Sequence, residues 1–308
     1  MKHIHQAKGI KYIPKKYIIE KGAISAFHKA IIFEGEVNDN EDDDSTTSLY
    51  KLCTPATFTR YLKPGALETE IDNPYSDRLD GSSEWSYISE IKAGDTITVS
   101  GNISEVKIRN GSLGEMCIVK STLNYVKQQN EISCTQINTI IYYNYSAKRQ
   151  MQLSPNTSAP IKNFFLNPTI ANFDSNSISI GDNIPGLIKQ PSTQQLVMYA
   201  GASRDFYQVH YDQQFAQSIG LPKVIVHGAL KSAFLGQMIT DFINQSATLN
   251  RLFVRYNSID FEGCLMKCKG TITKIVTVNS KKIIDCDIWI ENSVGIKTTE
   301  GTATFNLK

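Results

Sequence analysis

The segment VHGALKSAFLGQMITDFIN (residues 226–244) decides the fold, because it has helical character and is apolar on most of its faces. A helix of that kind is stable only when other elements surround it. Three stretches with strand-like alternation of apolar and polar residues follow it and close the chain: LNRLFVRYNSIDF (249–261), LMKCKGTITKIVTVN (265–279) and residues 281–308. We therefore expect an α+β arrangement in which a sheet wraps around a buried helix.

The first half of the chain repeats this order. The stretch YIIEKGAISAFHKAIIF (17–33) carries apolar residues at helical spacing: Ala23, Phe27, Ala30 and Ile31. Residues 93–143 then alternate apolar and polar residues, with turn signals at Asn110-Gly111 and Gln129-Asn130, and predict three long antiparallel strands. Two related helix-plus-sheet units packed side by side are expected, and not a parallel sheet in which strands and helices alternate.

The segments between these units predict loops and short helices. Residues 34–48 are acidic and nearly devoid of apolar residues, which favours a solvated loop over a calcium site. A connector rich in Ser, Asn and Pro separates the domains, which we place at 1–150 and 178–308, with the connector at 151–177 and a strand at SISIGD (177–182). The stretch 192–203 fits a strand or a helix, and 212–221 predicts a short helix capped by Asp212.

Composition excludes several classes of function. The net charge of +2 over 308 residues, without a basic block, argues against a nucleic-acid partner. No run of 18 apolar residues predicts a membrane span, and the polar start of the chain does not resemble a signal peptide, so a cytoplasmic location is expected. Cys264 and Cys268 lack a second pair of ligands, so no metal site is expected.

The stretch SRDFYQVHYD (203–212) contains a candidate catalytic pair, Asp205 and His210. Five residues on a regular helix would turn their side chains about 140° apart. They can meet only on an irregular turn, which is possible because the next helix need not begin before Asp212. A carboxylate and an imidazole together suit the addition or removal of water. The alternative is a turn-forming aspartate beside a core histidine.

Gly228, which opens the long apolar helix, is the second candidate. An N–H group at the start of a helix has no internal partner and carries partial positive charge. It can donate to a carbonyl oxygen that gains charge during a reaction. No glycine-rich phosphate loop between a strand and a helix is present in the sequence, which argues against nucleotide binding of that type.

Residues 199–230, YAGASRDFYQVHYDQQFAQSIGLPKVIVHGAL, resemble the hydratase motif of MaoC-like dehydratases, the (R)-specific enoyl-thioester hydratases of the hotdog fold. The matching positions are Ser203, Asp205, His210, Ala216 and His227-Gly228. In the first half, residues 79–103 and 110–131 resemble the FAS1-like dehydratase domain that precedes this motif in two-domain members.

The resemblance implies a double hotdog and a homodimeric assembly. One active site is expected, in the C-terminal half, because residues 1–150 contain no pair spaced like Asp205 and His210. It implies a thioester substrate, carried by coenzyme A or acyl carrier protein in fatty acid or polyketide metabolism, and (R)-stereochemistry. In hydration, Asp205 would draw a proton from water as it attacks C3, His210 would deliver a proton to C2, and the Gly228 N–H would stabilise the thioester oxygen. No cofactor is needed, because the thioester itself acidifies the α-carbon.

Further residues follow from the same resemblance. Ser203, Tyr207 and His227 would support the motif. The N-terminal half would do no chemistry and would wall the acyl cavity, with three candidates: Phe27, Ile31 and Phe58. The sequence departs from the motif at Arg204, where glycine is usual, and at Tyr207-Gln208, where Asn-Pro is usual. A cation beside Asp205 would lower its pKa.

Two other classes of function stay open. A hotdog thioesterase would hydrolyse the thioester with a carboxylate on the long helix, where the sequence offers only Asp241. A non-catalytic subunit that binds acyl thioesters, or a partner protein, would explain the departures at Arg204 and Tyr207-Gln208 as signs of a decayed site.

Overall fold

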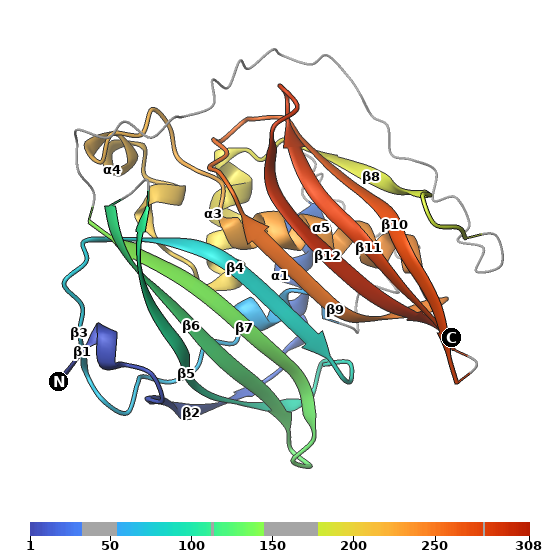
Figure 1. Cartoon of the computed structure of the whole chain (residues 1–308), viewed down its shortest axis with the longest axis horizontal. Coiled ribbons are helices and arrows are strands. Elements are labelled where there is room, and N and C mark those ends of the chain that lie inside the picture. Colours follow the sequence, from blue (N-terminus) through green and yellow to red (C-terminus); the bar gives the residue numbers. More distant parts are fainter. Residues whose placement is uncertain (33–53, 112–113, 145–177, 280) are drawn as a thin grey trace.

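The computed structural model describes residues 1–32, 54–111, 114–144, 178–279 and 281–308 (Figure 1). Its main element is one sheet of ten strands in the order β2-β5-β6-β7-β4-β9-β12-β11-β10-β8, and all neighbours are antiparallel. The N-terminal half supplies β2 (Lys11–Ile18), β4 (Asp77–Tyr87), β5 (Thr96–Gly111), β6 (Gly114–Lys127) and β7 (Ile132–Tyr143). The C-terminal half supplies β8 (Asn183–Lys189), β9 (Ala247–Tyr256), β10 (Met266–Val278), β11 (Lys281–Asn292) and β12 (Lys297–Leu307). A separate parallel pair joins β1 (Lys2–His3) to β3 (Ile71–Asp72).

The two halves of the sheet have the same strand order read from opposite edges. In each half the first strand, β2 or β8, lies at the outer edge, and the strand that follows the long helix, β4 or β9, lies at the centre. The halves join where β4 pairs with β9, from Ser82 opposite Arg255 to Ser86 opposite Arg251. The double hotdog expected from the sequence, two helix-wrapped antiparallel sheets in a pseudo-dimer, is therefore confirmed.

The helices lie on one face of the curved sheet (Figure 1). They are α1 (Lys21–Ile32), α3 (Thr193–Ser203), α4 (Gln213–Ser218) and α5 (Gly228–Ile243), with short 3-10 helices η1 (Ile4–Gln6), η2 (Phe58–Arg60) and η3 (Gln208–His210). The long helix α5 is buried on nearly all sides, as its apolar composition predicts. Its Phe234 shares one continuous core with Phe27 of α1 and with Trp85 and Leu252 of the two central strands. No helix in the described ranges is both long and apolar enough to cross a membrane.

The structure differs from the sequence-based expectation at several elements. The strand expected at 177–182 is wrong, because Gly181 has a φ of +95° in a turn and β8 begins only at Asn183. The last expected stretch contains two strands, β11 and β12, and the stretch 192–203 is helical. Strands β2 and β4 were not expected. The acidic loop at 34–48 and the connector at 151–177 lie outside the described residues.

The three candidates for the acyl wall, Phe27, Ile31 and Phe58, are at most 2 % exposed. The Phe27 ring contacts Phe58 edge-on at 5.4 Å between centroids and lies 5.6 Å from Tyr199 of α3. These side chains fill the core between the two halves. Their role as a wall for an acyl chain stays a prediction.

Phe58→Ala distinguishes filling the core from lining a space. Because the Phe58 ring is 1 % exposed, its removal should lower the free energy of unfolding by about 3–5 kcal/mol. Urea denaturation measures the loss, with Phe206→Ala as the control, since Phe206 is 62 % exposed and should change stability by only about 0.5 kcal/mol. A loss at Phe58 no larger than at Phe206 would contradict the packed core.

Candidate active site

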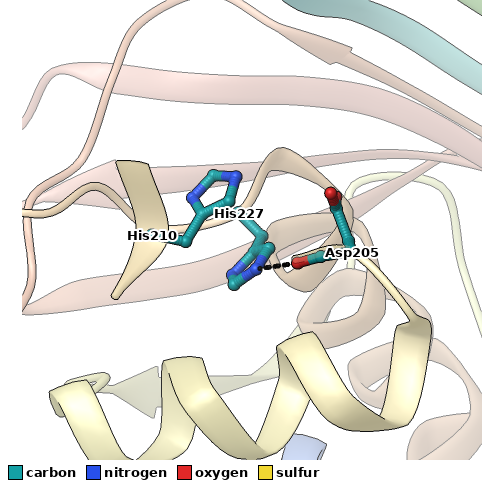
Figure 2. Close-up of side chains that lie close together, drawn as sticks. All are labelled: Asp205, His210 and His227. Carbon is teal, nitrogen blue, oxygen red and sulfur yellow. Dashed lines mark hydrogen bonds between the residues drawn. The ribbon is translucent and has the colours of Figure 1, made fainter. Parts of the chain in front are cut away.

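Three titratable side chains converge where α3, η3 and α5 meet (Figure 2). One carboxylate oxygen of Asp205 and one ring nitrogen each of His210 and His227 lie within 4.8 Å of one another. Asp205 follows the end of α3, His210 ends η3, and His227 immediately precedes α5. Both residues of the predicted pair are therefore at one site, and a second histidine joins them.

An irregular turn brings Asp205 to His210. Helix α3 ends at Arg204, whose φ of +58° lies in the left-handed region, and the Asp205 N–H donates to the carbonyl of Ala200 at 3.0 Å. A single 3-10 turn follows, in which the His210 N–H donates to the carbonyl of Tyr207. The next helix begins after Asp212, whose side chain accepts from Phe215 N at 3.0 Å. The chain thus has the irregular turn that the spacing requires, and the predicted cap is confirmed.

A hydrogen bond to the backbone orients His210. Its Nδ1 lies 2.8 Å from the carbonyl oxygen of Ile225, which can only accept, so Nδ1 carries the proton. Burial lowers the pKa of His210 below its ordinary value, although Asp205 and the bond to Ile225 act in the opposite direction. At neutral pH the ring is therefore neutral, and Nε2 holds a lone pair that can accept a proton.

Asp205 is half-buried, and its neighbours favour its ionised form. Burial alone would raise the pKa of Asp205, but the imidazole of His227, the ammonium of Lys63 and the imidazole of His210 outweigh it and hold the pKa below its ordinary value. The side chain of Arg204 points elsewhere, onto the ring of Tyr61. The cationic neighbour expected from the sequence is supplied instead by Lys63, from the N-terminal half.

His227 lies beneath the pair and is fully buried. Its ring stacks on His210 with 3.6 Å between centroids, and its Nε2 lies 3.3 Å from the backbone oxygen of Asp205. Burial, reinforced by His210, lowers the pKa of His227 to about 3. The ring is therefore neutral at physiological pH and supports both members of the pair. Tyr199 packs edge-on against it at 5.2 Å.

Gly228 is the first residue of α5, and its N–H precedes the hydrogen bonds of the helix. These begin where Leu230 donates to the carbonyl of His227 at 3.0 Å. The Gly228 N–H is thus a helix-start donor of the kind that binds developing negative charge. Tyr256 and Asp80 lie beside Gly228, since a Cβ at this position would be 3.4 Å from the Tyr256 ring and 3.5 Å from Asp80 Cβ.

A buried ion pair holds the start of α5. Lys231 Nζ contacts Asp260 Oδ2 at 2.8 Å and also donates to the carbonyl of Ser258, and both charged side chains are at most 2 % exposed. The backbone oxygen of Asp260 accepts from Val226 N at 2.8 Å. Asp260 therefore holds the His227–Gly228 turn from both sides, through Val226 before it and Lys231 after it. The sequence carried a signal for this pair that was missed, a single lysine inside an otherwise apolar helix.

The N-terminal half contributes polar groups that sequence reasoning also missed. Arg60 contacts Asp80 and the Tyr256 hydroxyl, each at 3.4 Å, and donates to Ser83. Tyr256 in turn hydrogen-bonds Ser232 on α5 at 2.7 Å. A chain of polar contacts therefore runs from the N-terminal half to the first turns of α5, close to Gly228.

The two remaining motif residues occupy supporting positions. Ser203 is buried, and its hydroxyl donates to the carbonyl of Tyr199 at 2.6 Å, so it reinforces the end of α3. The Tyr207 ring meets His210 edge-on at 6.1 Å between centroids, and it also contacts the Phe215 ring and the guanidinium of Arg78, each at 5.8 Å. Tyr207 thus borders the pair, while Ser203 acts through the backbone.

Two histidines and a carboxylate are also a possible donor set for a metal ion. Two imidazoles that share a metal aim their in-plane lone pairs at one point, about 2 Å from each nitrogen. The rings of His210 and His227 are stacked, 21° from parallel, so their planes cross well beyond that distance. As the rings stand, their geometry suits proton transfer better than joint coordination.

Comparisons with known proteins agree with this architecture. The family model of the FAS1-like dehydratase domain region matches residues 6–136, and that of the MaoC-like domain matches residues 175–286. No curated protein sequence matches the chain.

Solved structures resemble the whole chain at low sequence identity. A MaoC-like dehydratase is 18% identical with a TM-score of 0.70, and the match covers 99% of both chains. A MaoC-like dehydratase from Phytophthora capsici is 13% identical (TM-score 0.59; 99% of this chain, 97% of that one). A Mycobacterium tuberculosis protein with a double hotdog fold is 10% identical (TM-score 0.61; 98% and 96%). These likenesses establish the fold, and the two family models establish the kinship. The chain belongs to the MaoC-like dehydratases, as a two-domain member whose N-terminal half is a FAS1-like dehydratase region.

Proposed function

We propose that the protein interconverts a 2-enoyl thioester and an (R)-3-hydroxyacyl thioester by adding or removing water. The observation that carries the proposal is the meeting of an ionised Asp205 and a backbone-anchored His210 at one site with His227, the residue that immediately precedes Gly228 at the start of α5. The substrate would be a coenzyme A or acyl-carrier-protein thioester, and the active assembly a homodimer. Membership in the MaoC-like dehydratases supports this class of reaction.

In hydration, the pair holds one water by accepting its hydrogens. The water oxygen forms its bond to C3 while one of its protons passes to Nε2 of His210 and its other hydrogen stays hydrogen-bonded to the carboxylate of Asp205. The π electrons of the C2=C3 bond move toward the thioester oxygen, which accepts a hydrogen bond from the Gly228 N–H. The pair then returns a proton from His210 to C2, so it ends in its starting protonation state. Dehydration follows the same steps in reverse.

This scheme refines the roles expected from the sequence. Asp205 now accepts a hydrogen bond from the water instead of its proton, and His210 takes that proton and delivers it to C2. Because burial favours a neutral His210, the proton delivered to C2 originates in the water and not in a resting imidazolium. Nδ1 keeps its bond to Ile225 throughout, and the charge of Asp205 stabilises the imidazolium that forms transiently.

The thioesterase alternative has less support from the site. Asp241, the candidate carboxylate on α5, lies 13 residues after Gly228, which is about 20 Å along a helix axis. A non-catalytic binding subunit would not need both an ionised carboxylate and an anchored imidazole within reach of one water. A crotonyl thioester separates the three functions. A hydratase lowers its absorbance without releasing free thiol, a thioesterase releases free thiol, and a binding subunit does neither.

Loss of either member of the pair should abolish most turnover. Asp205→Asn and His210→Ala should each lower kcat by about 10²–10⁴-fold, because the site loses either the charge that stabilises the imidazolium or the imidazole that takes the proton. The controls are Asp72→Asn and His5→Ala, which make the same chemical changes in the N-terminal half, outside the site. Wild-type turnover in either site variant, with an unchanged melting temperature, would exclude the pair as the catalytic groups.

Replacing Gly228 with proline tests the role of its backbone N–H, because proline has none. Proline is favoured at the first position of a helix, and His227 already has the extended backbone (ψ 131°) that a following proline requires. Gly228→Pro should therefore preserve the helix but lower kcat by about 10²–10³-fold, because the donor is lost. Gly228→Ala keeps the N–H and is the matched control. Equal kcat values for the proline and alanine variants would assign the oxyanion contact to another donor.

The pH dependence of kcat/KM follows from the neutral His210. Protonation removes the Nε2 lone pair, so activity should be level at neutral pH and fall only below the ordinary histidine pKa of 6.5. Protonation of Asp205, whose pKa lies below 3.8, would remove what remains. A buffer series from pH 4 to 8 measures the profile. Activity that instead falls as the pH rises through 6.5 would mean that a resting imidazolium is required.

A further inference from the structure

We propose that Arg204 is a positioning residue that fastens the turn carrying Asp205 to the N-terminal half, through the ring and hydroxyl of Tyr61. Its effect on turnover rests on the proposed hydration activity, while the fastening itself can be measured without it. Arg204 stands at the point where α3 ends, immediately before the catalytic carboxylate.

The backbone at Arg204 is in a conformation that its side chain disfavours. Its φ is +58° and its ψ is 33°, which is the left-handed region. This conformation is common one residue past a helix, but glycine usually occupies it, because a Cβ crowds the following carbonyl. A residue with a long side chain persists there only when other contacts over-determine it. The contacts made by the Arg204 side chain are therefore the feature to explain.

Among the described residues, the Arg204 side chain makes its hydrogen bond and its ring contacts with the N-terminal half. Arg204 Nη2 donates to the Tyr61 hydroxyl at 2.6 Å, and the guanidinium lies over the Tyr61 ring, 4.0 Å from its centroid. Tyr17 of β2 is a second aromatic neighbour, with its centroid at 5.6 Å. A flat guanidinium both stacks and donates in this way, which the ammonium of a lysine does only in part.

The anchor is itself rigid. The Tyr61 ring stacks on the buried Phe58 at 5.3 Å, and the Tyr17 hydroxyl donates to the carbonyl of Lys63 at 2.7 Å. The turn at residues 58–63 is thus fixed to the core and to β2. Arg204 joins this turn to the 203–210 turn, so each turn limits the movement of the other.

The contact between Arg204 and Tyr61 explains how Asp205, in the C-terminal half, is influenced by the charge of Lys63, in the N-terminal half. Lys63 belongs to the anchored turn, and its charge is one of the groups that favour the ionised form of Asp205, together with His227, His210 and Arg60. If Arg204 releases the turn, Asp205 can move relative to both Lys63 and His210. Small displacements of this kind lower the rate of the chemical step more than they weaken substrate binding.

Arg204→Gly provides the sharpest test, because a structural role and a positioning role predict different results. Glycine relieves the left-handed backbone, so the melting temperature should not fall. We expect kcat to fall about tenfold while KM changes by less than about twofold. Asn130→Gly is the matched control, since Asn130 also has a left-handed backbone (φ +63°) and lies in the turn between β6 and β7. That variant should leave kcat unchanged.

Two further variants separate the side chain from the backbone. Tyr61→Phe keeps the ring but removes the hydroxyl, and it should lower kcat by about threefold, with no additional loss in the double variant with Arg204→Gly. Arg204→Lys should retain part of the activity. Hydrogen exchange of the amides in residues 203–210 should become faster in both Arg204→Gly and Tyr61→Phe and stay unchanged in Asn130→Gly.

The outcomes are distinct. Unchanged kcat and unchanged exchange in Arg204→Gly would overturn the proposal. So would a raised KM for crotonyl-CoA with unchanged kcat, which would make Arg204 a surface group that binds the thioester carrier. If the wild-type protein does not hydrate any thioester, the proposed function fails, and the exchange of residues 203–210 in Tyr61→Phe still decides whether Arg204 fastens the turn.

Discussion

The hydrogen bond from His210 Nδ1 to the carbonyl of Ile225 is the interaction on which the site depends. It fixes the tautomer, leaves the lone pair on Nε2 and keeps the ring stacked on His227. The acceptor is held just as firmly, because Ile225 N donates to the carbonyl of Val209 and Ile225 forms a bridge with Phe261. A backbone carbonyl in this position supports a neutral imidazole, and burial lowers the pKa of His210 in the same sense. The proton-accepting character of the site thus follows from how the chain folds around Ile225.

The same segment connects the pair to the helix that supplies the third group. Val226 donates to the backbone of Asp260, whose carboxylate holds Lys231 one turn inside α5. A buried ion pair contributes little to stability, because the cost of desolvation offsets much of the attraction. Its geometry is nevertheless demanding, and here it sets the position of the His227–Gly228 turn. The apolar core therefore stabilises the fold, and this ion pair positions the turn.

The division of labour between the halves is less strict than the sequence suggests. The candidate catalytic groups all lie in the C-terminal half, yet Lys63, Arg60 and Asp80 approach them from the other half. The continuous sheet makes this possible, since β4 and β9 pair at the centre and join the two halves into one sheet. A hotdog unit without catalytic groups of its own can thus still shape the electrostatics of its partner's site.

Local patterns explain what could be predicted from the sequence. The apolar stretch at 226–244 corresponds closely to α5, the alternation at 93–143 to β5, β6 and β7, and the short spacing of Asp205 and His210 to a single turn. Strand β2 escaped prediction because it is an edge strand that carries three lysines and a proline, and β4 because its residues are mostly polar. The contacts of Arg60, Lys63 and Asp260 were unpredictable, since they join residues far apart in the chain, and no local pattern encodes such a meeting.

The most direct test of the account is the product formed from crotonyl-CoA in deuterated water, identified by NMR. The account predicts (R)-3-hydroxybutyryl-CoA with a hydroxyl at C3 and one deuterium at C2, because a single site adds the elements of water to the double bond. Release of free coenzyme A without hydration, or recovery of unchanged crotonyl-CoA, would contradict it.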